Sequence, residues 1–137
     1  MKRETLPDSA ADASTASAPA TVHAPTGVHV LADLSGIAAD KLSDCAQLES
    51  LLRAAAEAAH ARVLFSHFHA FGEGQGVTGV VLLAESHITI HTWPECGFAA
   101  ADIFMCGSAE PKLALTLIEN ALQPEASHIH TARRGPP

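Results

Sequence analysis

Aromatic residues are scarce in this chain of 137 residues, which has five Phe, one Trp and no Tyr. Basic residues are also few, with 8 Lys and Arg against 15 Asp and Glu, so the formal net charge is -7. This balance argues against nucleic-acid binding, which leaves a basic footprint, and suits a small cationic ligand drawn to a negative cleft. Apolar residues still make up 47% of the chain, enough for one domain with its own core.

The chain also has few cysteines and no long apolar run. Its three cysteines, Cys45, Cys96 and Cys106, are an odd number, and no secretory signal is visible. A disulfide framework is therefore not expected. We expect a cytoplasmic protein with reduced thiols that does not enter a membrane.

Residues 1–25 are rich in Ala, Ser, Thr and Pro without an apolar period, which predicts a disordered tail before a domain at 26–137. Apolar periodicity predicts strands at 27–36, 62–71, 97–107 and 127–134, and helices at 42–61 and 110–122. Residues 77–93 form one long extended run or two strands that meet near residue 85. Asp40 or Ser43 is expected to cap the first helix.

This order of elements predicts the fold class. Consecutive strands with short turns imply an α+β domain of two layers, a largely antiparallel sheet with helices on one face. Two layers leave the other sheet face uncovered. If that face is apolar, a second copy of the chain is expected to cover it.

The segment LLAESHITIHTWPE (82–95) carries polar residues inside an apolar run. A Ser in a strand is usually structural, and a nucleophilic Ser86 would need a base within hydrogen-bond reach. His91 is five residues away and points to the opposite face on an unbent strand, so a bend or a break would be needed. No G-x-S-x-G elbow is present.

Two other groups could carry chemistry. Cys106 ends an apolar strand next to Gly107, a position that suits either a buried structural cysteine or a site residue. A metal site could be built from His67, His69, His87, His91 and Asp33. Because the chain has no H-E-x-x-H and no C-x-x-C, we predict no metal.

The runs VTGVVLLAESHITIHTWPE and GFAAADIFMCG resemble the prokaryotic S-adenosylmethionine decarboxylases, pyruvoyl enzymes of spermidine synthesis. GVHVLADL is similar to the family's first strand and FSHFHAF to its second, so the resemblance covers roughly residues 27–134. It implies a homodimer in which two sheets face each other in an αββα sandwich, with the active sites at the interface.

The resemblance also implies roles for the residues that match. Ser86 becomes a covalent pyruvoyl group when the Glu85–Ser86 bond is cut, leaving a β chain, 1–85, and an α chain, 86–137. The pyruvoyl ketone then forms a Schiff base with the substrate amine and draws electrons as CO₂ leaves. His91 transfers a proton during processing, and Cys106 donates a proton in decarboxylation.

On the substrate side, Glu95 matches a carboxylate that holds the substrate ribose, and Asp33 stands where some members have a Glu near the substrate. Thr78 stands where some members have a Ser that assists processing. Phe71 and Phe68 could stack on the adenine or lie near the sulfonium. Both could instead be core residues, and we favour that role for Phe68.

Three alternatives stay open at this stage. The same fold includes pyruvoyl-dependent ornithine and arginine decarboxylases, whose substrates are also cationic. An unprocessed binding or regulatory homologue would keep the fold without the cut. A metal-dependent enzyme would use the histidines instead.

Overall fold

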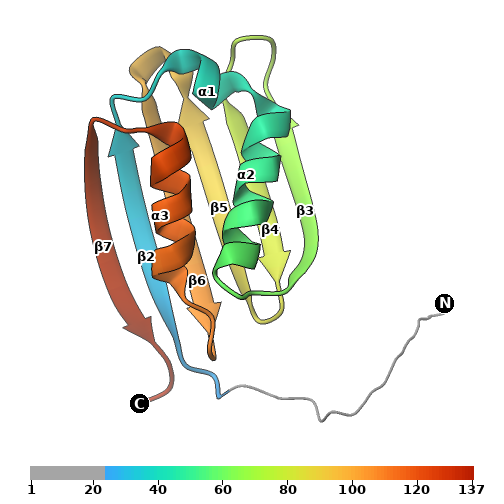
Figure 1. Cartoon of the computed structure of the whole chain (residues 1–137), viewed down its shortest axis with the longest axis vertical. Coiled ribbons are helices and arrows are strands. Elements are labelled where there is room, and N and C mark those ends of the chain that lie inside the picture. The colour runs from blue at the N-terminus through green and yellow to red at the C-terminus, as the bar shows by residue number, and fades with distance from the viewer. Residues whose placement is uncertain (1–23) are drawn as a thin grey trace, which may run out of the picture.

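The computed structural model describes residues 24–137, so the predicted tail lies almost wholly outside the described residues. Figure 1 shows one sheet with helices packed on it. The strands are β2 (Gly27–Ser35), β3 (Val63–Ala70), β4 (Val77–Leu83), β5 (Ser86–Trp93), β6 (Phe98–Cys106) and β7 (Ala126–Arg134). The helices are α1 (Ala39–Ser43), α2 (Cys45–Ala58), α3 (Pro111–Leu122) and the short 3-10 helix η2 (Pro94–Cys96).

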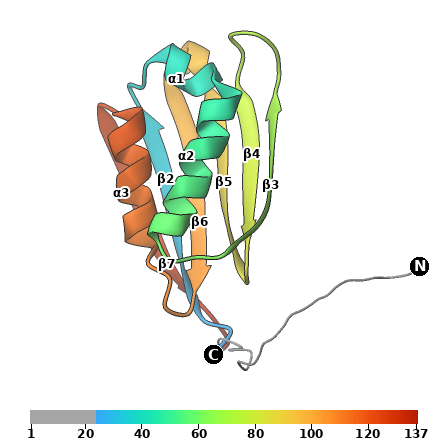
Figure 2. The ribbon, with the colours of Figure 1, turned by 45° about the vertical axis from the view of Figure 1, so that its right-hand side comes forward.

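The sheet has the strand order β3-β4-β5-β6-β2-β7. Each neighbouring pair of strands is antiparallel. In Figure 2 the helices lie on one side of the sheet. The predicted two-layer α+β fold and its order of elements are therefore confirmed. Among residues 24–137, no helix is long and apolar enough to span a membrane.

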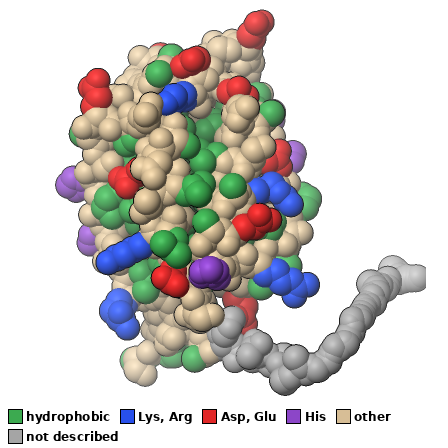
Figure 3. Space-filling view, viewed as in Figure 1, with side chains coloured by type: hydrophobic (Ala, Val, Ile, Leu, Met, Phe, Trp, Pro, Cys, Tyr) green, Lys and Arg blue, Asp and Glu red, His purple; other side chains and the backbone are tan. Residues whose placement is uncertain are grey.

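Strict alternation along the strands places the core between sheet and helices. On β6, Ala99, Ala101, Ile103 and Met105 are buried, while the residues between them are only partly buried. Helix α2 contributes Leu48 and Leu52 from one stripe, and α3 contributes Ile118. Figure 3 shows hydrophobic side chains in the gap between these two helices.

The predicted helix over 42–61 is divided at Asp44. This residue has an extended backbone (φ -89°, ψ 91°), and its carboxylate accepts a hydrogen bond from the Gln47 N–H at 3.1 Å. Asp44 is therefore the N-cap of α2, and the prediction that Asp40 or Ser43 would cap it was wrong. Both of those residues lie within α1.

A β-bulge changes which face of β3 each residue occupies. Val63 pairs with Leu83 and Phe65 with Leu82, so Leu64 is the extra residue. Phe65, His67 and His69 consequently point away from the helices, whereas Val63 packs against the core.

The sheet face without helices, which we call the open face, carries large apolar side chains. Leu31, Phe65, Leu82 and Trp93 are between 41% and 56% exposed. Large exposed apolar patches usually mark an interaction site. The uncovered and partly apolar face expected from the sequence is thus present.

Candidate active site

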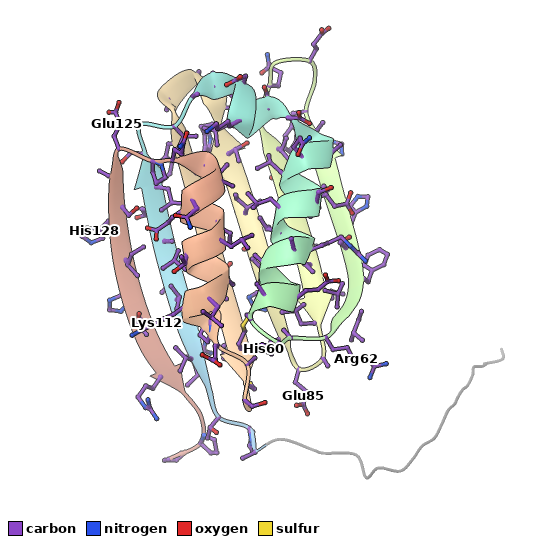
Figure 4. All side chains as sticks on the ribbon, viewed as in Figure 1. His60, Arg62, Glu85, Lys112, Glu125 and His128 are labelled. Carbon is purple, nitrogen blue, oxygen red and sulfur yellow. The ribbon has the colours of Figure 1, made fainter. Side chains whose placement is uncertain are left out.

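A tight hairpin joins β4 to β5 at the predicted cut. Only Ala84 and Glu85 lie between the strands, and Glu85 has a positive φ of 66°, a left-handed conformation that costs a non-glycine residue steric energy. Figure 4 shows Glu85 at the end of the molecule where His60 and Arg62 also lie. The Ala84 N–H donates to the Arg62 carbonyl at 3.0 Å, which fixes the turn.

Ser86 begins β5 directly after this strained residue. Its hydroxyl donates to the Ala84 carbonyl at 3.3 Å, and the residue is partly buried. Because Ser86 pairs with Leu83, whose side chain is in the core, Ser86 starts on the helix-covered side of the sheet.

Cys106 lies at the same end of the sheet. His87 pairs with Phe104, so the start of β5 runs beside the end of β6, where Cys106 is partly buried. Burial, with a smaller contribution from the negative charge of Glu85, raises the pKa of the Cys106 thiol. The thiol is therefore kept in the protonated form that a proton donor needs.

Thr78 and His91 lie at the opposite end of the sheet. They face each other across β4 and β5, with Thr78 Oγ1 3.1 Å from Nδ1 of His91. His91 pairs with Ala100, and Ala100 pairs with Asp33, so Asp33 occupies the same row of the open face.

The remaining candidate substrate residues divide between the two sides of the sheet. Glu95 is exposed in η2, and Phe71 is 64% exposed just after β3, both at the end where His91 lies. Phe68 instead packs against the core, and its ring fills the space where a Cβ on Gly79 would lie. This position favours the structural role for Phe68, and we leave it out of the candidate site.

The structure thus separates the candidate residues into two groups within one chain. Ser86 and Cys106 are at one end of the sheet, while Thr78 and His91 are towards the other. Strand β5 pairs with β4 and β6 without a bulge, so the bend that could have joined Ser86 to His91 is absent from it. Five residues of strand separate the two by about 17 Å.

The histidines and Asp33 considered for a metal site do not gather. Among residues 24–137, the His, Cys and acidic side chains that come close enough to share an ion are His29, His87 and Asp102. Sequence reasoning missed this cluster. One signal was available, because Asp102 is the only charged residue in the apolar run 97–107.

Comparison with known proteins identifies the family. The S-adenosylmethionine decarboxylase family model matches residues 28–135. The chain belongs to the S-adenosylmethionine decarboxylase family.

Relatives named S-adenosylmethionine decarboxylase proenzyme agree with this assignment. The one from Sulfurihydrogenibium sp. is 44% identical over 110 residues, which cover 80% of this chain and 82% of that protein. The one from Aquifex aeolicus is 42% identical over 110 residues, covering 80% and 81%. The crystal structure of the adenosylmethionine decarboxylase from Aquifex aeolicus matches with a TM-score of 0.74 at 40% identity, over 80% of this chain and 91% of that one.

These family members share the name proenzyme, which fits a chain that must be cut before it acts. The decarboxylase family assignment also favours S-adenosylmethionine over ornithine or arginine as the substrate.

Proposed function

We propose that this chain is a self-processing S-adenosylmethionine decarboxylase that cuts itself between Glu85 and Ser86. One observation carries the proposal: Ser86 follows a residue held at φ 66° and begins β5 at the end of the sheet where β6 ends in Cys106. A serine next to a strained peptide, at the same end of the sheet as a thiol whose pKa is raised, fits both a cut that uses the serine and a later proton transfer.

The cut needs only groups of the chain and one water molecule. The Ser86 hydroxyl attacks the Glu85 carbonyl carbon, and the amide becomes an ester with a free amine at residue 86. A base removes the Cα proton of residue 86, and elimination releases Glu85 as the carboxylate end of the β chain. The dehydroalanine left on the α chain adds water and loses ammonia, which leaves a pyruvoyl group.

His91 suits the base, with Thr78 within hydrogen-bond distance of its ring. Because about 17 Å of strand separates Ser86 from His91 in one chain, we propose that His91 acts on Ser86 of a second copy. An isologous two-fold contact repeats such a pair, so each dimer has two equivalent sites. The two β5 strands would then run antiparallel across the interface, with the axis near Thr89.

The open face supports this homodimer. It presents Leu31, Phe65, Leu82 and Trp93 as exposed apolar side chains, and facing sheets pack about 10 Å apart. Pairing two open faces would bury these side chains and give the αββα sandwich. It would also bring Cys106 and the Ala84–Glu85 hairpin of one copy to the His91 end of the other. The hairpin would have to turn for the Ser86 hydroxyl, which starts on the helix-covered side, to reach that His91.

In the processed protein the pyruvoyl group supplies an electron-withdrawing ketone that the twenty amino acids lack. The chain's own residues hold the substrate and move the proton. Cys106 would donate a proton to the substrate carbon that loses CO₂, which suits a thiol whose pKa is raised by burial and by Glu85.

Recognition of a sulfonium nucleoside would come from the other end of the partner's sheet. Phe71 offers an exposed ring for the adenine, and the exposed Glu95 carboxylate suits the ribose hydroxyls. Asp33 adds negative charge in the same row as His91, which favours a cationic substrate.

Intact-mass spectrometry and CO₂ release together test this function. The purified protein should show chains 1–85 and 86–137, and the Ser86→Ala variant should stay a single chain near 14.2 kDa. CO₂ should come from S-adenosylmethionine and not from ornithine or arginine, with or without a chelator. A wild-type chain that stays uncut after long incubation would disprove the proposal.

A further inference from the structure

Asp102 lies at the centre of a polar cluster on the open face. Its Oδ2 is 2.5 Å from Nε2 of His29 on β2 and 2.9 Å from Nε2 of His87 on β5. The Thr89 hydroxyl donates to its Oδ1. The side chains of Asp102, His29 and His87 are 20%, 17% and 35% exposed. The reaction proposed above gives none of these side chains a role.

Arg134 shows how the cluster is protonated. Its Nη1 lies 3.1 Å from Nδ1 of His29. A guanidinium can only donate, so Nδ1 accepts, and the ring proton lies on Nε2, which donates to Asp102. A metal ion on Nε2 would need the proton on Nδ1, where Arg134 already donates. In this arrangement the cluster is a hydrogen-bonded network.

The Asp102 carboxylate is the anchor of this network. Burial alone would raise the pKa of Asp102, but hydrogen bonds from Thr89, His29 and His87 outweigh it and hold the pKa below its usual value. The carboxylate is consequently charged at neutral pH and accepts from all three. Hydrogen bonds to a charged group are shorter and stronger than neutral ones, and they fix geometry.

His87 connects this anchor to the proposed cofactor, because it directly follows residue 86 in the chain. Before the cut, residue 86 is held on both sides, by the hairpin through Glu85 and by strand β5. After the cut the hairpin is open, and residue 86 becomes a free chain end, the part of a domain that orders least unless it is tied down.

We propose that Asp102 is a positioning residue: by holding the His87 side chain, it fixes the first residue of the α chain beside Cys106 once the chain has been cut. The inference rests on the proposed function. His29 belongs to the β chain, while Arg134, Asp102 and His87 belong to the α chain, so the same network also ties the two products together.

This role predicts a separation between the two reactions. Removing the anchor should leave the self-cleavage rate close to that of wild type, because the intact hairpin restrains residue 86 at that stage. Turnover of the cut protein should fall about 10²-fold, the effect of a misplacement near 1 Å. KM should change little, because Phe71 and Glu95, which bind the nucleoside, lie elsewhere.

The test compares Asp102→Asn with Asp40→Asn, a matched substitution on the exposed helix α1. Intact mass follows the rate of cleavage, and labelling with a hydrazine counts the ketone at residue 86. Then kcat per ketone and KM are measured with S-adenosylmethionine. We expect normal cleavage, normal KM and reduced kcat in Asp102→Asn, and wild-type values in Asp40→Asn.

The outcomes distinguish this inference from the proposed function. A wild-type protein without cleavage or ketone would overturn both. The wild-type protein could be cut and carry the ketone while Asp102→Asn and Asp40→Asn have equal kcat per ketone. That result would overturn the positioning role and leave the proposed function standing. Equal slowing of cleavage and turnover in Asp102→Asn would also overturn it, since general destabilisation would act on both.

A second pair of variants decides the matter if Asp102→Asn does not fold. Gln at position 87 keeps an N–H donor for the Asp102 carboxylate, and Leu keeps only bulk. His87→Gln should retain more kcat per ketone than His87→Leu while both cleave at similar rates. Equal turnover in the two would contradict the inference.

Discussion

Ser86 and His91 lie on one unbroken strand, five residues apart, with their side chains on opposite faces of the sheet. Within a single chain these two groups cannot meet. If both take part in the cut, as we propose, His91 comes from another copy whose open face meets this one, and the Ala84–Glu85 hairpin turns Ser86 towards it.

Mixing two inactive variants tests this arrangement. Ser86→Ala and His91→Ala should each remain uncut alone. When the two are co-expressed, a mixed dimer has one site that combines the Ser86 of the His91→Ala chain with the His91 of its partner. We expect the His91→Ala chain to be cut and the Ser86→Ala chain to stay whole, which the masses of the fragments distinguish.

Native mass spectrometry provides the control by showing that mixed dimers form. A mixed dimer without any cut chain would contradict the proposed sharing of His91. If the His91→Ala variant were cut when it is expressed without Ser86→Ala, His91 would be dispensable.

The sequence predicted the fold well because its signals are local. Alternation in 98–106 and the helical stripe of α2 each lie within a few residues, so the elements and their faces follow from period alone. The placement of Ser86 and His91 on opposite faces of the sheet also follows from the alternation of side chains along a strand.

The Asp102 cluster could not be predicted in this way. One of its partners, His29, is 73 residues away in sequence, and their contact depends on β2 inserting beside β6. The helix cap at Asp44 and the bulge at Leu64 were missed for a related reason. Each depends on the backbone conformation of one residue, which interrupts the regular helix or strand and leaves no mark in the apolar pattern.

Cys106 should separate decarboxylation from processing. Cys106→Ala is expected to cut itself normally, because the thiol takes no part in the proposed cleavage. CO₂ release should fall by about 10²–10⁴-fold, the usual contribution of a positioned acid. Intact mass and CO₂ release from the same preparation test this, and full turnover in Cys106→Ala would remove its assigned role.

Glu85 should contribute to the alkaline limit of that activity. Burial, and then the charge of Glu85, raise the Cys106 pKa, so the thiol stays protonated and able to donate to higher pH than an ordinary thiol. Glu85→Gln removes the side-chain charge and should move the alkaline fall in kcat to lower pH. Glu119→Gln, on α3 away from the site, is the control, and identical pH profiles for the two variants would contradict the effect.

The left-handed conformation of Glu85 should be measurable as strain. Glycine removes a steric cost of about 1–2 kcal/mol but loses about 0.5–1 kcal/mol more entropy on folding. In the uncut Ser86→Ala background, Glu85→Gly should therefore raise the free energy of unfolding by up to about 1.5 kcal/mol. With Ser86 present, the relaxed peptide should be cut more slowly.

His60 provides a matched control, because its φ of 67° is close to that of Glu85. His60→Gly should stabilise the chain by a similar amount in denaturant melts and leave the rate of cleavage unchanged. If Glu85→Gly and His60→Gly were cut equally fast, strain at residue 85 would have no part in processing.

Gly27 is expected to leave room for the Cys106 thiol. A Cβ at this position would lie 2.5 Å from the Met105 carbonyl oxygen and 2.8 Å from the Cys106 sulfur. Because the first of these atoms is backbone, Gly27→Ala must displace the end of β6, at a cost of about 1–3 kcal/mol. Denaturant melts should show that loss, and kcat should fall while self-cleavage continues.

Gly74→Ala is the comparison, since a Cβ there meets nothing within 4 Å and the residue only has a positive φ of 73°. It should lose some stability through backbone strain while keeping its turnover, because a Cβ there displaces no neighbouring atom. Equal kcat in Gly27→Ala and Gly74→Ala would mean that the thiol tolerates displacement. The position of Cys106 against β2 would then matter for packing and not for the proton transfer that we propose.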